Sequence, residues 1–356
     1  MHLDERIESF AWLGDLLGEY FNHGASPDPS RDQSMAILNK AIIASEEQNQ
    51  WFIEDYVKYA LREWARILSR DNLFKWLNAY PSDLLDKQPG LRIGTIMAGN
   101  IPLVGFHDFL TILISGNRLE ARLSSKDKEL LPAIADLMIL HNPGWDEMIH
   151  FHDEKLGPID AIIATGSNNT FRYFQYYFGS YPHIFRKNRN GLAVLTGDES
   201  KDELKKIADD IFLYFGLGCR NISKILIPEG YPLPGFIESL EHYSWLKDHN
   251  KYANNYNYFR SVYLLNKIPH LDNGFFLLKE DHGMQSPVAN LYYEYYHDPG
   301  HSKQIIDQNK KQIQCIVGTY MPGEETVTFG STQNPNLWNY ADGVDTLNFL
   351  LNLCKN

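Results

Sequence analysis

The chain has few cysteines, and they are not arranged for cross-linking or for metal binding. Three thiols occur among 356 residues, Cys219, Cys315 and Cys354. An odd number of widely spaced cysteines fits no disulfide framework, and no close pair of the zinc-ligand type occurs. We therefore expect reduced thiols and a cytoplasmic protein.

Long apolar runs and an excess of basic residues are also missing. The longest apolar stretch, residues 103–114, is interrupted by His107 and Asp108 and is too short to cross a bilayer. The N-terminus is acidic and amphipathic, unlike a signal peptide, so we expect neither secretion nor membrane insertion. The formal net charge of −12 argues against a nucleic-acid partner, because such binding needs a basic face.

The remaining pattern predicts a globular α/β protein with a helical N-terminal region. Residues 1–90 are rich in helix formers and carry an apolar stripe at helical spacing. From Leu91 onward, strands alternate with glycine-containing loops and helices, which is typical of a parallel sheet. A second α/β unit starts near Gly191. The tyrosine-rich run 251–260 is interpreted as an ordered surface loop.

Cys219 lies in a glycine-rich connection between a predicted helix and a predicted strand. The capping box Ser200-x-x-Glu203 opens the helix, which should end at Gly216. The apolar run 224–227 predicts a short buried strand. Such a connection can present a nucleophilic thiol, and the cation of Arg220 would lower its pKa. The competing interpretation is a buried structural cysteine.

Three further segments follow predicted strands and carry groups suited to ligand binding. Gly166-Ser167 leads into a helix, whose N-terminal N–H groups and dipole favour a pyrophosphate. Asn100 ends the first strand, at the edge where open α/β sheets bind ligands. Arg122 and Ser124 follow the second strand, where a dinucleotide-binding sheet meets the adenosine ribose. Each segment has a competing interpretation. Gly166-Ser167 could be only a helix cap, Asn100 could lie in an ordinary turn, and Ser124-x-x-Asp127 could be a capped helix start.

In their order along the chain, these segments resemble the acyl-CoA reductases of the LuxC type, within the aldehyde dehydrogenase superfamily. The match runs from about Leu91 to the C-terminus. Its most specific parts are Phe329-Gly330-x-x-Gln333-x-Pro335 and Asp342-Gly343-x-Asp345-Thr346. The resemblance implies an α/β, aldehyde dehydrogenase-like fold. Its parts would be a helical region (1–90) packed on the cofactor domain, a Rossmann-type NAD(P)-binding domain (91–195), a catalytic α/β domain (196–335) and a C-terminal segment (336–356).

The resemblance also implies a role for each residue singled out above. The nucleophile would be Cys219, and the oxyanion donor would be Asn100. The cofactor-binding residues would be Arg122 and Ser124 at the adenosine ribose, and Thr165, Gly166 and Ser167 at the pyrophosphate. The expected activity is reduction of an acyl-CoA, or another acyl thioester, to an aldehyde through a covalent acyl-cysteine. NADPH is the expected cofactor, no metal is expected, and homo-oligomerisation is left open.

One departure from the wider superfamily favours reduction over hydrolysis. Hydrolytic aldehyde dehydrogenases carry a Glu-Leu-Gly-Gly segment whose Glu activates water, but residues 185–191 contain no carboxylate here. An acyl-cysteine without a positioned base should persist until a hydride reaches it. Leu217 also replaces the usual Gln of the nucleophile motif, and the chain is shorter than typical relatives.

Two other functions are compatible with the sequence. One is an NAD(P)-dependent aldehyde oxidoreductase acting on another activated acyl group, such as an acyl phosphate. The other is a catalytically silent binding subunit that docks a partner through its tyrosine-rich surface. His297-Asp298-x-x-His301 lacks a third ligand and is interpreted as a polar loop. Aromatic residues that could line an acyl tunnel, or more commonly form core, are Phe106, Phe109, Tyr173, Phe174 and Tyr177.

Overall fold

The computed structural model describes residues 1–22, 29–87, 90–319 and 323–353. They form two compact units. Unit 1 contains residues 1–187 and 336–356, and unit 2 contains residues 188–335. Each unit is built around a sheet in which nearly all neighbouring strands are parallel.

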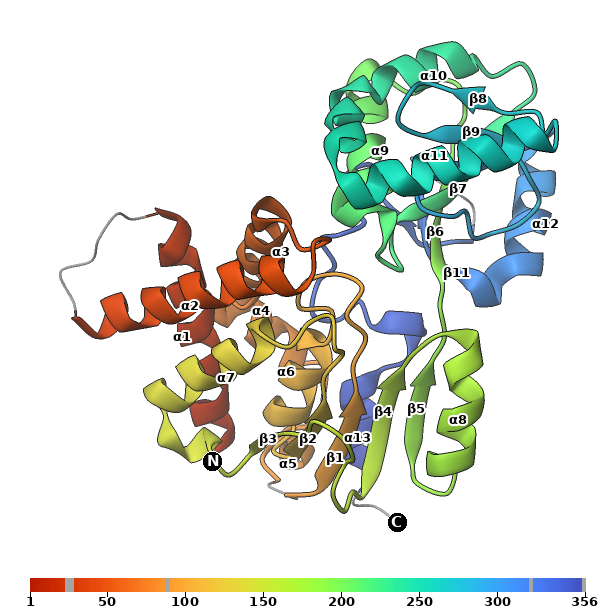
Figure 1. The fold of residues 1–356 in the computed structure, drawn as a ribbon. Helices are drawn as coiled ribbons and strands as arrows, with labels where there is room; N and C mark the ends of the chain where they lie inside the picture. The colour runs from red at the N-terminus through yellow and green to blue at the C-terminus, as the bar shows by residue number, and fades with distance from the viewer. Residues whose placement is uncertain (23–28, 88–89, 320–322, 354–356) are drawn as a thin grey trace. The chain divides into compact units, whose positions relative to one another are not determined.

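The sheet of unit 1 has five parallel strands in the order β3-β2-β1-β4-β5 (Figure 1). Because the strand order reverses between β1 and β4, this sheet has a topological switch point there. The sequence-based strands near 92, 118 and 161 are confirmed. The bounds are β1 Arg92–Ile96, β2 Arg118–Arg122, β3 Ile149–Phe151, β4 Ala161–Thr165 and β5 His183–Arg186.

Helices of unit 1 come from both ends of the chain. The predicted helical character of the N-terminal region is confirmed by the five helices that the structure describes within residues 1–22 and 29–87. Residues 336–353 return to the same unit as a turn and a final helix. Their bounds are α1 Leu3–Asn22, α2 Pro29–Gln48, α3 Glu54–Ile67, α4 Arg70–Leu77, α5 Ser82–Leu85, α6 Phe106–Ile114, α7 Leu130–His141, η1 Pro143–Trp145, α8 Asn168–Phe178, η5 Ala341–Gly343 and α13 Thr346–Asn352.

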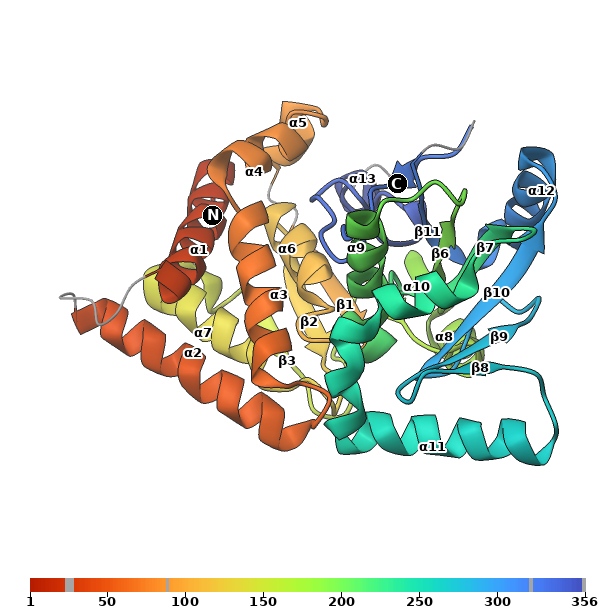
Figure 2. The same cartoon turned by 90° about the horizontal axis from the view of Figure 1, so that it is seen from above.

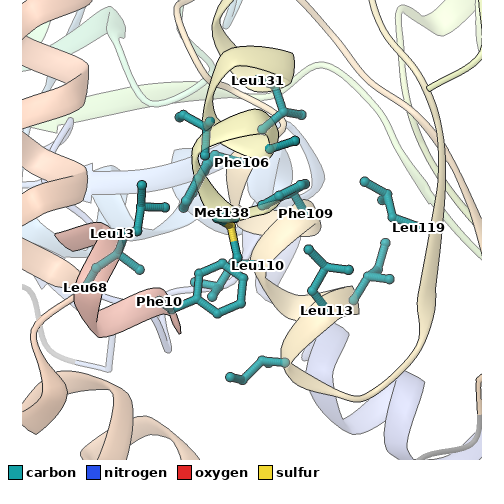
Figure 3. Close-up of a cluster of buried hydrophobic side chains, with 14 of the residues drawn as sticks. Phe10, Leu13, Leu68, Phe106, Phe109, Leu110, Leu113, Leu119, Leu131 and Met138 are labelled. Atoms are coloured by element: carbon teal, nitrogen blue, oxygen red, sulfur yellow. The ribbon is translucent and has the colours of Figure 1, made fainter. Parts of the chain in front are cut away.

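The N-terminal helices share one hydrophobic core with the helices that follow β1 and β2. Figure 3 shows Phe10 and Leu13 of α1 beside Phe109 of α6 and Met138 of α7. The rings of Phe10 and Phe109 lie 6.3 Å apart in an edge-to-face arrangement. Phe106 and Phe109 are fully buried here, which excludes them as tunnel-lining residues. Phe174 is also buried, whereas Tyr173 and Tyr177 are exposed.

Unit 2 contains a seven-stranded sheet in the order β12-β11-β6-β7-β10-β9-β8, in which only the β8–β9 pair is antiparallel. Its strand β6 starts at Asn190, close to Gly191, where the sequence suggested a second α/β unit. The strands are β6 Asn190–Val194, β7 Ile222–Pro228, β8 Leu271–Asp272, β9 Leu277–Glu280, β10 Asn290–Tyr296, β11 Ile313–Val317 and β12 Thr326–Val327. The helices are α9 Lys201–Phe212, η2 Leu213–Gly216, α10 Leu233–Ser239, η3 Glu241–Asp248, α11 Asn250–Leu265, α12 Pro299–Asn309 and η4 Lys310–Gln312.

The predicted loop over 251–260 is wrong, because these residues form most of α11 (Figure 2). The His249 side chain caps this helix by accepting the N–H of Tyr252 at 3.3 Å. Tyr252, Tyr256 and Tyr263 are buried on it. The polar composition of this run led to the prediction of a surface loop. The buried face of the helix is formed by tyrosines, whose rings are largely apolar.

The polar loop predicted around His297 is in fact the start of α12. Asp298 is the N-cap, and its carboxylate accepts the N–H of His301 at 3.0 Å. Within the described ranges, no three His, Cys, Asp or Glu side chains are grouped so that they could hold a metal ion. No helix in the same ranges is long and apolar enough to cross a membrane.

Candidate active site

Cys219 lies half-buried in the loop that joins α9 and η2 to β7 in unit 2. The capping box at Ser200 and Glu203 is confirmed, but α9 ends at Phe212 and not at Gly216. Three consecutive residues explain the early end, because Tyr214, Phe215 and Gly216 have φ angles of 54°, 59° and 73°. Left-handed backbone costs a residue with a side chain roughly 1–2 kcal/mol. The segment before Cys219 is therefore strained.

Buried contacts hold this strained segment in place. The Phe215 ring is 1% exposed and lies 4.3 Å from the His249 ring and 6.1 Å from the Tyr252 ring, centroid to centroid. Burying an aromatic ring of this size stabilises the fold by about 1.5–3 kcal/mol. Because that gain is as large as the backbone cost, the turn persists, and such strain clusters at functional sites.

The Asn221 carboxamide ties the Cys219 loop to the end of α9. Its oxygen accepts the N–H of Gly218 at 2.8 Å. Its nitrogen donates to the carbonyls of Asp210 at 3.0 Å and Leu213 at 2.9 Å, which the helix itself leaves unpaired at its C-terminus. Asn221 is 2% exposed, so these hydrogen bonds are shielded from water. We describe Gly216–Asn221 below as the nucleophile loop.

The nucleophile loop also packs against the start of β6, at Gly191. A Cβ on Gly191 would lie 2.6 Å from the carbonyl oxygen of Arg220, so only glycine allows this approach. Beside it, the thiol of Cys315 on β11 donates to the same carbonyl at 3.6 Å. Burial raises the pKa of Cys315 to about 12, which keeps this thiol protonated. Cys315 is therefore structural, and Cys354 lies outside the described residues.

Asn100 lies half-buried in the loop between β1 and α6 of unit 1. Leu103 in this loop has φ 57°, and its N–H donates to the carboxylate of Asp127 at 3.0 Å. A Cβ on Gly99 would lie 2.5 Å from the side chain of Ser124, so the loop packs directly on the segment after β2. Burial raises the pKa of Asp127 to about 7.

Arg122 and Ser124 lie at the carboxyl end of β2. Arg122 is exposed, and the Ser124 hydroxyl accepts the N–H of Lys126 at 3.3 Å. The interpretation of Ser124-x-x-Asp127 as a helix cap is wrong, because α7 starts only at Leu130. The segment is a turn whose polar residues follow the strand directly.

Thr165, Gly166 and Ser167 join β4 to α8. The tight turn and helix predicted here are confirmed, with Ser167 as the N-cap that accepts the N–H of Thr170 at 3.3 Å. A Cβ on Gly166 would meet the ring of Phe174 at 3.0 Å, so the backbone lies close to the helix it precedes. The N-terminus of α8 therefore faces the carboxyl edge of the sheet of unit 1.

Arg186, in the stretch 185–191 that lacks a carboxylate, is a buried ion-pair partner. Its guanidinium donates to both oxygens of Asp108, at 2.8 and 2.6 Å, and to the hydroxyl of Thr346 at 2.8 Å. The pair links the end of β5 to α6 and α13 within unit 1. No carboxylate projects from this stretch.

Solved structures with a similar course of the chain are aldehyde dehydrogenases. An NAD-dependent aldehyde dehydrogenase from Sinorhizobium meliloti is 12% identical with a TM-score of 0.61, over 90% of this chain and 76% of that one. Betaine aldehyde dehydrogenase from Staphylococcus aureus, in complex with NAD+, is 13% identical with a TM-score of 0.57, over 86% and 68%. The chain has an aldehyde dehydrogenase fold.

A Δ-pyrroline-5-carboxylate dehydrogenase from Mycobacterium tuberculosis shares the aldehyde dehydrogenase fold with this chain at 15% identity, with a TM-score of 0.52 over 96% of this chain and 78% of that one. Neither a family model nor a curated protein matches the sequence.

Within this aldehyde dehydrogenase fold, the predicted site residues fall into two groups. One group lies at or just after the carboxyl ends of β1, β2 and β4, at one edge of the sheet of unit 1, and consists of Asn100, Arg122, Ser124 and residues 165–167. Cys219 belongs to the nucleophile loop of unit 2.

Sequence reasoning missed the roles of three residues that hold these loops in place, Asp127, Asp210 and Asn221. Asp127 was interpreted only as part of a helix cap. Asp210 carried a signal, because it is an acid three residues after Ile207 on the apolar stripe of α9.

Proposed function

We propose that this protein is an acyl-CoA reductase that forms an aldehyde from an acyl thioester through a covalent acyl-Cys219. The observation that carries the proposal is the placement of Cys219 in a strained, anchored and half-buried loop of a chain with an aldehyde dehydrogenase fold. Strain at a loop that presents a thiol favours a functional role over a packing role. The substrate class rests on the LuxC-type resemblance.

The carboxyl edge of the sheet in unit 1 fits a nicotinamide dinucleotide. The switch point lies between β1 and β4, and ligands of open α/β sheets bind outside the carboxyl ends of such strands. The N-terminus of α8 suits the pyrophosphate, with Thr165, Gly166 and Ser167 as the turn around it. Arg122 and Ser124 suit the adenosine ribose. When bound, NADPH supplies the hydride that reduces the acyl group.

The chain's own residues perform the acyl transfer. The thiolate of Cys219 adds to the carbonyl carbon of the thioester, and the Asn100 amide donates to the oxyanion that develops. The carbonyl re-forms as the carbon–sulfur bond to CoA breaks, and CoA leaves with the electron pair as a thiolate. After hydride transfer to the acyl carbon, the resulting oxyanion re-forms the carbonyl as the carbon–sulfur bond to Cys219 breaks, which releases the aldehyde and returns the electron pair to sulfur as the thiolate.

The end of β5 and the residues after it favour reduction over hydrolysis. Hydrolysis of an acyl-cysteine needs a base that removes a proton from water. Arg186 is a cation held by Asp108 and Thr346 and cannot serve as that base. We infer that acyl-Cys219 persists until it is reduced.

The first prediction concerns CoA release without cofactor. Incubated with acyl-CoA alone, the protein should release about one CoA per active site in a burst and then nearly stop, because nothing removes the acyl group. Addition of NADPH should restart CoA release in step with aldehyde formation. Rapid-quench assays of free thiol and aldehyde measure both phases.

Continuous production of free acid without cofactor would contradict this prediction and indicate a thioester hydrolase. Glu324 and Glu325 would then be the first candidate bases. Glu324 lies 3.4 Å from Lys303 and 3.7 Å from Lys310. Glu324→Gln and Glu325→Gln should then abolish acid formation. If an acyl phosphate gives a burst of inorganic phosphate while an acyl-CoA gives no burst of CoA, the substrate is another activated acyl group.

The second prediction is a preference for NADPH over NADH. Arg122, Ser124 and Lys126 offer positive charge and donors to a 2′-phosphate. Glu120 on the same strand is the nearby carboxylate that could favour NADH, but it is 6% exposed and its Oε2 is 2.6 Å from Nε2 of His152. Arg122→Ala should lower kcat/KM for NADPH about tenfold and change that for NADH little.

Arg118→Ala is the matched control, because Arg118 starts the same strand at its amino end. It should leave both kcat/KM values unchanged. A wild-type preference for NADH, or equal losses with both cofactors in Arg122→Ala, would refute the assignment of Arg122 to the 2′-phosphate.

A further inference from the structure

Asp210 is a buried carboxylate that the proposed reaction does not use. It lies on α9 and is 1% exposed. Its two oxygens accept backbone N–H groups from a segment 120 residues later, Oδ2 from Gly330 at 2.6 Å and Oδ1 from Thr332 at 2.9 Å. Gly330 has φ 80°, and a Cβ on it would lie 3.1 Å from the Cβ of Lys206, so this segment packs directly on α9. Asp210 therefore anchors residues 329–333 to the helix.

The same segment contacts the nucleophile loop. Nε of Arg220, the residue after Cys219, donates to the carbonyl of Thr332 at 2.6 Å. The carboxamide of Gln333 lies against Gly218, where a Cβ would be 3.4 Å from Oε1. Thr332 is fully buried and is bonded on both sides, by Asp210 at its N–H and by Arg220 at its carbonyl. A continuous chain of hydrogen bonds thus runs from Asp210 to the neighbour of Cys219.

We infer that Asp210 is a positioning residue for Cys219, which it reaches through Thr332 and Arg220. The inference rests on the proposed function in one respect, that Cys219 is the nucleophile. Removing the carboxylate would leave the buried N–H groups of Gly330 and Thr332 without their acceptor. Residues 329–333 would have to move for these N–H groups to find another acceptor. Arg220 would then lose the fixed position of its acceptor, and a displacement of about 1 Å at a reacting group can lower its rate about 100-fold.

The charge state of Asp210 gives the inference a specific pH signature. Burial raises the pKa of Asp210 to about 6, although the N–H groups of Thr332 and Gly330 act in the opposite direction. The charged or titratable groups around it are Lys206 and Asp209 on α9, Arg220 in the nucleophile loop and Cys315 on β11. As pH falls through about 6, the carboxylate gains a proton and its hold on the two N–H groups weakens.

The experiment compares Asp210→Asn with Asp209→Asn in the full-length protein. Asp209 is the adjacent carboxylate, exposed and bonded to the Tyr243 hydroxyl at 2.7 Å, so its substitution makes the same charge change away from the loop. Alkylation of Cys219 by iodoacetamide, followed by mass spectrometry, reports thiol reactivity without any substrate. We expect Asp210→Asn to slow alkylation and the acyl-CoA burst about 10- to 100-fold, and Asp209→Asn to change neither.

The pH profile separates positioning from general stability. In the wild type and Asp209→Asn, log alkylation rate against pH should steepen below about pH 6, where both the thiolate and the Asp210 carboxylate are lost. Asp210→Asn should show only the thiol slope. Hydrogen exchange of the peptide spanning 329–333 should rise in the same variant. If Asp210→Asn does not fold, Asp210→Glu carries the test, because it keeps the charge and displaces it by one methylene.

Unchanged Cys219 alkylation and an unchanged pH profile in a folded Asp210 variant would overturn the inference, whatever its melting temperature. Failure of the proposed function gives a different result. In that case the wild type shows no CoA burst, while alkylation of Cys219 still responds to Asp210.

Discussion

Cys219→Ser should abolish turnover while the protein stays folded. A serine hydroxyl at this position stays protonated, whereas the thiol of Cys219 can react as a thiolate. Acyl transfer depends on the negative charge of that thiolate. We expect kcat to fall on the order of 10³-fold or more, since removal of a nucleophile leaves only binding and oxyanion stabilisation. The loop should keep its shape, because the hydrogen bonds of Asn221 and Arg220 hold it in place and both remain in the variant. Aldehyde formation and the melting temperature are the two measurements.

Cys315→Ser is the matched control. It removes the other described thiol of unit 2, which donates to the Arg220 carbonyl and whose pKa burial raises to about 12. A serine keeps that donor, so activity should remain within a few fold of the wild type. After mixing with acyl-CoA, mass spectrometry should find the acyl group on Cys219. An adduct on Cys315 or Cys354 would overturn the assignment of the nucleophile.

The sequence predicted the features of the fold that depend on local patterns. The capping box at Ser200 needs only residues three apart, and the strand–turn–helix at 161–178 needs only an apolar run, a glycine and a cap. The sequence did not specify the order of the strands, but the alternation of strands and helices along the chain predicted a parallel sheet. These features are set by neighbours along the chain, so a single sequence contains them.

Features that depend on distant residues were not predicted. The left-handed turn at Tyr214 and Phe215 contradicts local preference and is compensated by packing against His249 and Tyr252, more than 30 residues later. The anchoring of Thr332 by Asp210 joins residues 122 apart. No local signal reports such pairings. The predicted site residues were singled out because each lies at or shortly after the end of a strand or a helix, where a motif can be recognised, and their roles stay predictions.

Asn100→Ala should lower kcat by roughly 10²- to 10³-fold while cofactor affinity stays nearly unchanged. The Asn100 amide is proposed to donate to charge that develops only in the transition state, and loss of one such donor has an effect of this size in other enzymes. The β1–α6 loop should survive the substitution, because the bond between the Leu103 N–H and Asp127 remains. The single-turnover acylation rate, the Kd for NADPH and the melting temperature should be measured together.

Asn142→Ala shows what a purely structural asparagine does. Its side chain accepts the N–H of Gly144 at 3.0 Å in the turn after α7, and its loss should destabilise the fold by about 1 kcal/mol without changing kcat. If Asn100→Ala behaves like Asn142→Ala, Asn100 is a turn residue and the oxyanion must be bound by another donor. If acylation slows at unchanged NADPH affinity, the Asn100 amide acts in the acyl-transfer step and not in cofactor binding.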